Sequence, residues 1–365
     1  MKILIVQDHL RSGGTERQSI LLARSFLTEG HSVRLLTFRP GGALDSTLGD
    51  IPRICLQPFD TGLDWFAPDL DRAVARFGPE IVLCMGRMAN CYGGRIQRRN
   101  PDSAVVATLR TGKPLPWLFR RSLQEVAQVV ANSEEARATL VREHAVAANR
   151  VAVIYNGLVF PPASPPTDQA RQAERARHGA TDATCVLLSV AMFRPEKGQA
   201  ELLTTAAQLP KSIDWQLWLA GDGPALETCR RLAASLGLAD RVRFLGWQAT
   251  PASLYSAADI AVHASRSEAL SNFLIEAQAS GLPAVAYNAQ GISECLLPAS
   301  TGSVIARGDT AAFVDAVIRF ASAPPAERIA RSEQARRFAR ERFDPARQTR
   351  SYLQLFSSLS TRPNP

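Results

Sequence analysis

Long apolar runs are missing from this sequence of 365 residues, and no stretch reaches the roughly 20 residues that a membrane-spanning helix requires. The apolar start, MKILIV, is interrupted by Asp8 and His9, too early for the core of a signal peptide. We therefore expect a first β-strand at residues 2–7 and no helical membrane span.

Metal and disulfide frameworks are also missing. The six cysteines form no CxxC pair, which favours a reducing cytosol over a disulfide scaffold, and the five histidines are scattered without the spacing of a zinc site. Neither GxGxxG nor GxxxxGK[ST] occurs, so the common dinucleotide and P-loop fingerprints are absent. We expect no metal and no cofactor.

The charge is far from neutral, at +8 with a pI of about 9.5, while the hydrophobic fraction of 46% is that of a soluble globular protein. An excess of positive charge suits nucleic acid, an anionic membrane or an anionic substrate. Because much of the excess is arginine spread over predicted helices, a solvated basic surface explains it equally well.

Strand-like and helix-like segments alternate along the whole chain, which predicts an α/β protein with parallel sheets. The apolar strand candidates fall into two groups, which lie at residues 2–7, 33–38, 81–84, 104–108, 129–131 and 151–154, and at residues 185–190, 215–220, 242–245, 259–263 and 284–287. Between the groups, the proline cluster PPASPPTD suits neither sheet nor helix interior and predicts a linker. The segment 325–358 reads as helical and rich in arginine.

Several turns that follow predicted strands have the composition of anion sites. Ser12–Gly13–Gly14–Thr15 precedes a helix whose Thr15 and Gln18 form a possible capping box, and glycines there let the backbone approach a ligand. Arg194 and Lys197 lie in RPEKG, after the strand at 185–190. The planar guanidinium of arginine and the compact ammonium charge of lysine both suit a diphosphate at the carboxyl end of a strand. The alternative readings are a tight turn and a basic surface turn.

Residues 267–286, SEALSNFLIEAQASGLPAVA, predict a loop, a helix, a turn and a strand. Ser271 or Asn272 can begin the helix, and Gly281 can end it in a left-handed conformation. Glu276 lies inside the helix with no cation three or four residues away, so it needs another partner unless it sits at an exposed edge.

The order of these motifs is specific. RPEKG, LAGDGP, VRFLGW, SAADIAVHAS, the stretch 267–286 and GISE together resemble the C-terminal half of the retaining nucleotide-sugar glycosyltransferases of family 4, and GGTER and VVANSEEARATL also resemble that family. The resemblance covers nearly the whole chain. It implies a GT-B fold of the α/β class, in which two Rossmann-like, doubly wound parallel-sheet domains face a central cleft. The expected domains are residues 1–160 for the acceptor, a linker at 161–180 and residues 181–342 for the donor, with a final helix at 343–360 packing back on the first.

The resemblance also implies roles for individual residues. Glu268 would face the hydroxyls of the donor sugar, while Arg194 and Lys197 would neutralise the leaving diphosphate. Glu276 would bind the ribose. The full set of implied donor-binding residues is Glu276, Gly13, Gly14, Leu270, Ser271, Asn272, Gly246, Trp247 and Gly221. Arg110, at a place where many relatives carry histidine, would contact the donor phosphate or an anionic acceptor.

The expected activity is therefore retaining transfer of a sugar from a nucleotide sugar, most simply a UDP-sugar, to a glycan acceptor of a bacterial surface polysaccharide or lipopolysaccharide, lipid-linked or not. Asp69-Leu-Asp71 matches the metal-binding DxD pattern, but we interpret it as the acidic start of a helix. The alternatives are a GT-B nucleotide-sugar epimerase and a non-catalytic nucleotide-sugar binding protein.

We expect a cytoplasmic protein without nucleic acid partners. A segment that mixes cations with aromatics would contact an anionic membrane, and it comprises Arg110, Lys113, Trp117, Phe119, Arg120 and Arg121, with Arg95, Arg98 and Arg99 as possible additions.

Overall fold

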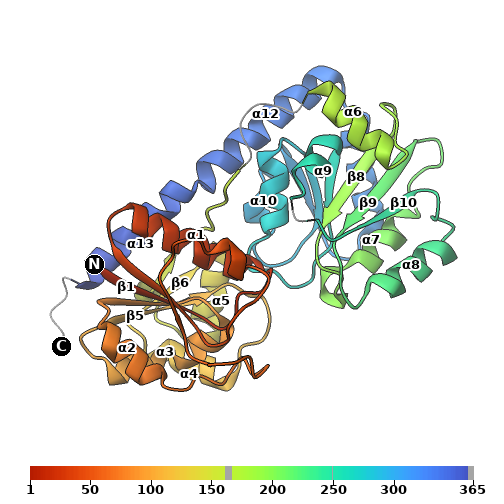
Figure 1. Ribbon diagram of the computed structural model, residues 1–365. Helices are drawn as coiled ribbons and strands as arrows, with labels where there is room; N and C mark the ends of the chain where they lie inside the picture. Colours follow the sequence, from red (N-terminus) through yellow and green to blue (C-terminus); the bar gives the residue numbers. More distant parts are fainter. Residues whose placement is uncertain (161–166, 249, 361–365) are drawn as a thin grey trace. The chain divides into compact units, whose positions relative to one another are not determined.

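The chain forms two compact units in the computed structural model, which describes residues 1–160, 167–248 and 250–360 (Figure 1). The first unit joins Met1–Gly157 to the C-terminal segment that starts at Asp344, and the second unit spans Leu158–Phe343. Each unit is described by itself below.

The first unit is built on a seven-stranded sheet in which every pairing is parallel, with strand order β3-β2-β1-β4-β5-β6-β7. Its strands are β1 Lys2–Gln7, β2 Ser32–Thr37, β3 Arg53–Cys55, β4 Ile81–Cys84, β5 Ala104–Leu109, β6 Gln128–Ala131 and β7 Val151–Val153. Its α-helices are α1 Gly14–Thr28, α2 Leu70–Phe77, α3 Arg87–Arg99, α4 Trp117–Glu125, α5 Glu134–His144 and α13 Pro345–Ser360.

Both faces of this sheet are covered, as the apolar strands require. Along β1, Leu4 belongs to the core cluster on one face, and Ile3 and Ile5 belong to the cluster on the other. The second cluster includes α13, whose Tyr352 and Phe356 pack edge-on against Phe26 of α1, with ring centroids 6.3 and 5.6 Å apart. The C-terminal helix is therefore part of the core of the first unit.

The second unit contains a six-stranded sheet with parallel pairings in the order β10-β9-β8-β11-β12-β13. Its strands are β8 Cys185–Val190, β9 Trp215–Ala220, β10 Val242–Gly246, β11 Ile260–His263, β12 Ala284–Tyr287 and β13 Gly302–Ile305. Its α-helices are α6 Asp168–Arg177, α7 Gln199–Ala206, α8 Leu226–Ser235, α9 Ala252–Ala257, α10 Asn272–Ala279, α11 Thr310–Ala321 and α12 Pro325–Arg342.

Both sheets share the doubly wound strand order of the Rossmann fold, which confirms the predicted fold class. In such sheets the order reverses once, and ligands bind at the carboxyl ends of the two strands that flank the reversal. These switch points lie between β1 and β4 in the first unit, and between β8 and β11 in the second. The glycine loop 12–14 follows β1, and RPEKG follows β8.

Two expectations about chain organisation need correction. The proline cluster at 161–166 lies outside the described residues, but α6, which the sequence analysis placed in the linker, packs within the second unit. Its Arg175 side chain is only 1% exposed and contacts Asp259 at 3.2 Å, and Arg171 reaches the same carboxylate at 2.6 Å. The helical segment 325–358 is two helices, α12 and α13, because Pro345 cannot continue a helix.

Candidate functional site

The loops after β8 and β11 meet at the switch point of the second sheet. RPEKG forms a 3-10 turn, η3 Pro195–Lys197, that ends at Gly198 with φ of +73°. A Cβ atom at Gly198 would lie 2.1 Å from the carbonyl oxygen of Ala264, just after β11, so this close approach requires glycine. The Arg266 amide also donates to the Glu196 carbonyl at 2.7 Å. The two loops are therefore held together by their backbones.

This contact places Lys197 beside Glu268, 71 residues away in sequence. The Lys197 Nζ donates to Glu268 Oε1 at 2.7 Å, and His263 Nε2 lies 3.6 Å from the same oxygen. Burial raises the pKa of Glu268, but the nearby His263 and the charge of Lys197 outweigh it and hold the pKa at about 2. Glu268 is therefore ionised at neutral pH, and its side chain keeps 13% of its surface exposed.

Glu276, which lies inside α10, has a hydrogen-bond partner on another helix. The Tyr255 hydroxyl of α9 donates to Glu276 Oε2 at 2.5 Å, and Tyr255 is only 4% exposed. Burial, together with the neighbouring carboxylate, raises the pKa of Tyr255 well above its ordinary value, so the hydroxyl remains a donor. Phe273 stacks on Tyr255 with ring centroids 6.2 Å apart and also lies 5.8 Å from the His263 ring. One aromatic side chain thus adjoins the partners of both glutamates.

Tyr255 and His263 were not singled out from the sequence. His263 is a polar residue at the end of a strand whose four positions are all buried, and that oddity was a usable signal. Tyr255 gave no comparable signal, since an aromatic residue in a short helix is ordinary core. Its role depends on a contact across 21 residues.

The start of α10 agrees with the sequence prediction. Ser271 is the N-cap, and its side chain accepts a hydrogen bond from the Leu274 amide at 3.4 Å. The amide of Ser271, one of the residues implied to bind the donor, donates to Cys295 Sγ at 3.4 Å. Leu270 is buried and Asn272 is half-buried beside it. The Ser271 amide thus has a partner inside the protein.

The remaining predicted donor residues of this unit lie at the same edge of the sheet, each at the end of a strand or in the loop after it. Gly221, with φ of +141°, follows β9, and its amide donates to the Gly246 carbonyl at the end of β10 at 2.7 Å. Trp247 comes next and is 62% exposed, so its ring is free to stack on a planar group. Arg194 is exposed at the start of RPEKG.

In the first unit, Gly13 and Gly14 form the start of α1, where Gly13 is the N-cap. Helix α1 begins at Gly14 and no side chain caps it, so the expected capping box of Thr15 and Gln18 is wrong. The Gln18 side chain instead donates to the Gly157 carbonyl at 2.6 Å. The Glu16 carboxyl lies under the glycine loop, because a Cβ atom at Gly13 would be 2.4 Å from Glu16 Oε2. An anion at this helix start would therefore meet a buried carboxyl group.

Glu16 makes a pH-dependent contribution to stability. Burial raises its pKa from 4.5 to about 7. Between these values the folded protein keeps a proton that the unfolded chain has released, so stability falls as pH rises, and the whole cost applies above pH 7. We expect Glu16→Gln to raise the free energy of unfolding at pH 8, relative to its effect at pH 5, by roughly 2–3 kcal/mol. Urea denaturation at both pH values measures this.

The control is Glu29→Gln at the exposed end of the same helix. Equal changes for Glu16→Gln at pH 5 and pH 8 would contradict the burial of a protonated carboxyl group.

Arg110, a candidate for contacting phosphate or acceptor, has partners inside the first unit. Its guanidinium donates to Asn156 Oδ1 and, at 2.8 Å, to the Tyr352 hydroxyl of α13. It thus ties the end of β5 to the C-terminal helix. The sequence suggested the loop position but could not reveal a partner 242 residues away.

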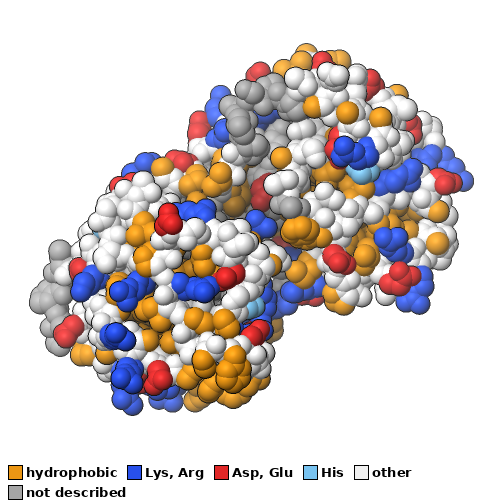
Figure 2. Space-filling model, viewed as in Figure 1, with side chains coloured by type: hydrophobic (Ala, Val, Ile, Leu, Met, Phe, Trp, Pro, Cys, Tyr) orange, Lys and Arg blue, Asp and Glu red, His pale blue; other side chains and the backbone are white. Residues whose placement is uncertain are grey.

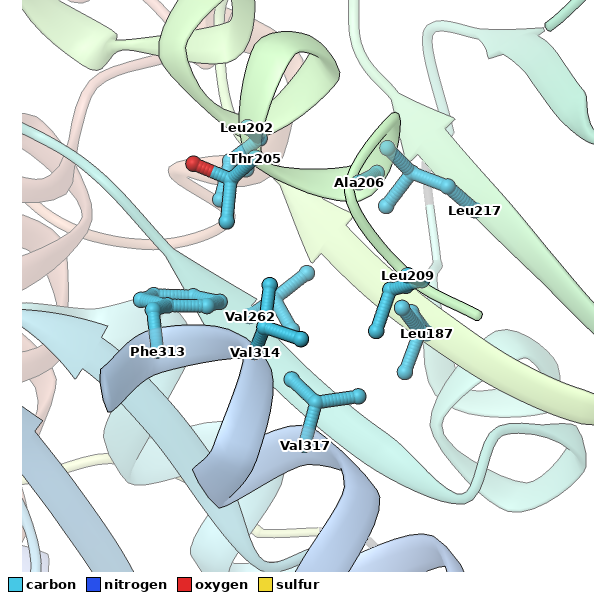
Figure 3. Close-up of a pocket in the computed structure, with 10 residues that line it drawn as sticks. All are labelled: Leu187, Leu202, Thr205, Ala206, Leu209, Leu217, Val262, Phe313, Val314 and Val317. Atoms are coloured by element: carbon cyan, nitrogen blue, oxygen red, sulfur yellow. The ribbon is translucent and has the colours of Figure 1, made fainter. Parts of the chain in front are cut away.

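The apolar pocket in the core of the second unit is not a ligand site (Figure 3). Leucine and valine side chains from β8, β9, β11, α7 and α11 enclose about 10 Å³, close to the volume that one water needs. The hydroxyl of Thr205 at its edge already bonds to the Tyr287 hydroxyl at 3.0 Å.

The DxD pattern, Asp69-Leu-Asp71, lies at the start of helix α2. Asp69 is the N-cap of α2 with φ of +53°, and Asp71 in the first turn accepts a hydrogen bond from Arg95 at 2.8 Å. Within residues 1–160, 167–248 and 250–360, no group of three or more His, Cys, Asp or Glu side chains is arranged to hold a metal ion.

Solved structures share this architecture. The Anabaena protein HepE, crystallised in complex with UDP, superposes with a TM-score of 0.82 at 22% identity, covering 98% of this chain and 100% of that one. A glycosyltransferase from Rickettsia africae gives a TM-score of 0.83 at 20% identity, with 99% of each chain covered. At such identities the likeness concerns the fold, which is that of the GT-B glycosyltransferases.

Sequence comparison identifies the family. The family model "Glycosyl transferases group 1" matches residues 170–341, and "Glycosyltransferase Family 4" matches residues 12–159. The chain belongs to the glycosyltransferases of family 4. A curated relative, the lipopolysaccharide core biosynthesis glycosyltransferase LpsD of Rhizobium meliloti, is 34% identical over 171 residues, which are 47% of this chain and 49% of LpsD. The chain thus spans about half the length of the curated relatives it matches.

Proposed function

We propose that the chain transfers a sugar from a nucleotide diphosphate sugar to a glycan acceptor. The observation that carries this proposal is the Lys197–Glu268 pair at the switch point of the second sheet, where such folds bind ligands. A lysine ammonium at that position suits the diphosphate, and an ionised carboxylate accepts hydrogen bonds from sugar hydroxyls. Glu276, with one oxygen held by Tyr255, would accept from the ribose hydroxyls.

In the proposed reaction the bond between the anomeric carbon and the diphosphate oxygen breaks, and a bond from that carbon to the acceptor oxygen forms. The acceptor proton leaves with the departing diphosphate, whose growing charge Lys197 and Arg194 would stabilise. Transfer on the same face of the sugar would retain the anomeric configuration. The anomer of the product, read by proton NMR coupling, tests retention directly.

UDP is the proposed nucleotide, because HepE was crystallised with UDP and with UDP-glucose. The exposed Trp247 ring after β10 is the proposed stacking surface for the base. The proposed acceptor is a bacterial surface glycan, in line with the lipopolysaccharide core biosynthesis that LpsD and LpsE are named for.

A thermal-shift panel of UDP-, GDP- and ADP-sugars tests the donor. A ligand that binds only the folded protein adds about 2.7 kcal/mol of stability at a concentration of 100 times its Kd. We expect a rise in Tm with UDP-sugars alone. No shift with any nucleotide sugar would reject the proposal, and conversion of free UDP-sugar without acceptor would indicate an epimerase instead.

Metal independence is part of the proposal, because Lys197, Arg194 and the start of α10 can supply the countercharge that a cation would otherwise provide. Turnover should therefore be undiminished in excess EDTA, and Asp69→Ala combined with Asp71→Ala should cost little activity. The assay compares initial rates with and without chelator, at equal ionic strength. Activity that disappears with EDTA and returns with Mg²⁺ or Mn²⁺ would show that the phosphate chemistry lies elsewhere.

We also propose a cytoplasmic protein in peripheral contact with an anionic membrane. All six cysteines, each within the described residues, are free thiols. No helix in the described part of the chain has the length and hydropathy to cross a bilayer. The contact segment expected from the sequence needs revision, since Phe119 is only 1% exposed and Arg110 is bound internally. Trp117, Arg120 and Arg121 remain exposed on α4 and support the proposal.

A further inference from the structure

Large hydrophobic side chains gather at one end of the first unit. Figure 2 shows hydrophobic surface near α4, which Figure 1 labels in the same view. The exposed members in this unit, on α4 and on the loop before α2, are Phe59, Leu63, Trp65, Phe66, Trp117 and Leu118. We call this set the apolar patch.

The loop part of the apolar patch is held in place by hydrogen bonds. The Gln57 side chain, whose residue is 1% exposed, donates to the carbonyls of Leu63 and Phe66 at 3.0 and 2.6 Å. The Tyr92 hydroxyl of α3 donates to the Trp65 carbonyl at 2.7 Å. Exposed aromatic residues on a loop that hydrogen bonds hold in place are typical of an interaction surface.

A groove of about 540 Å³ runs between α3 and α4 next to this patch. Both helices follow strands of a parallel sheet and run in the same direction, as the Arg98–Glu125 ion pair near their C-terminal ends shows. The N-terminal end of the groove is mainly apolar, with Trp65, Met88 and Leu118. The C-terminal end is charged, with Arg95, Arg98, Arg121 and Glu125. The groove is therefore amphipathic along its length.

The charged end has an excess of cations that face solvent. Arg95 pairs with Asp71 at 2.8 Å, and Arg121 pairs with Glu125 at 3.1 Å. The side chains of Arg95, Arg98 and Arg121 are 50%, 54% and 57% exposed, so three cations share two carboxylates. Arg99 and Arg120 nearby are exposed as well. Positive charge beside exposed aromatic rings is typical of segments that lie in a membrane interface.

We propose that this groove binds one anionic phospholipid of the bilayer, with the phosphate at Arg95 and Arg121 and an acyl chain along Met88, Cys91 and Leu118. From Arg95 back to Met88, α3 extends over about 10 Å, since an α-helix rises about 1.5 Å per residue. One acyl chain reaches across half of the roughly 30 Å hydrocarbon thickness, so the groove would hold the part of the chain nearest the phosphate. With the apolar patch inserted, the chain points into the bilayer. The inference rests on the proposed membrane contact and not on the transferase reaction.

Sedimentation with vesicles tests the charged end. Full-length protein should pellet with vesicles of equal parts phosphatidylcholine and phosphatidylglycerol, less so at high salt, and not with phosphatidylcholine alone. Arg95→Gln combined with Arg121→Gln should weaken binding about tenfold or more, since both lie where basic residues attract anionic lipid. The control pair is Arg142→Gln with Arg350→Gln, exposed on α5 and α13 of the same unit. Equal loss in both pairs would overturn the proposal, because it would indicate general attraction only.

Quenching of tryptophan fluorescence by phosphatidylglycerol with brominated acyl chains tests the apolar end. Trp65 lines the groove, whereas Trp117 belongs to the patch but does not line the groove. Trp65→Phe should therefore abolish most of the quenching, and Trp117→Phe should remove less. Equal losses, or binding without quenching, would overturn the lipid site and leave a superficial contact. Donor binding, measured by thermal shift without vesicles, should be unchanged in all these variants, so failure of the lipid site and failure of the transferase proposal are separate results.

Discussion

Replacing Lys197 with alanine is expected to lower kcat by about 10²–10³-fold, the usual cost of removing one preorganised group that stabilises charge in a transition state. The diphosphate gains charge as its bond to the sugar breaks, so the interaction with Lys197 strengthens on the way to the transition state. Arg194→Ala should act in the same direction and more weakly, because Arg194 is exposed and solvent screens its charge.

Steady-state kinetics with a saturating acceptor measure this effect. Lys211→Ala removes an exposed lysine from the same unit and should leave kcat unchanged. Circular dichroism and Tm must accompany the assay, since Lys197→Ala removes the ammonium group that pairs with the largely buried Glu268 carboxylate. An effect of Lys197→Ala confined to KM would mean that Lys197 binds the ground state and the transition state equally, and the role proposed for it would be wrong.

Much of the fold could be predicted from the sequence, because buried parallel strands are short apolar runs and helices separate them. The start of α10 at Ser271 was predictable for a local reason, since a serine hydroxyl there accepts from a backbone amide of the first turn. The end of the linker could not be predicted from the sequence, because the burial of Arg175 in α6 depends on Asp259, 84 residues further along the chain.

The candidate site was predictable only in part for the same reason. Lys197 and Glu268 could each be found as residues after a strand, but their contact depends on β8 and β11 being neighbours in the sheet. The apolar patch shows a similar limit. The mixture of cations and aromatics drew attention to Trp117, whereas Trp65 lies in a loop, where exposure has no periodic signal.

Replacing Glu276 with alanine is expected to reduce donor affinity by about 10- to 150-fold, equivalent to roughly 1.5–3 kcal/mol for lost hydrogen bonds to a charged group. The fold should persist, because Glu276 is half-buried and alanine is a good helix former. Isothermal titration calorimetry with the UDP-sugar identified by the panel measures the change. An unchanged Kd would remove Glu276 from the donor site.

Tyr255→Phe sharpens the same test, because it removes the hydroxyl that holds Glu276 Oε2 and keeps the ring that stacks on Phe273. The Glu276 carboxylate then lacks this hydrogen bond and is less well oriented when the donor binds, so we expect a smaller loss of about 0.5–1.5 kcal/mol in affinity. Tyr287→Phe is the matched control, since it removes a buried hydroxyl bonded to Thr205 in the same unit. If Tyr255 acts through Glu276, the double variant should bind donor no worse than Glu276→Ala alone; additive losses would show that Tyr255 contributes independently.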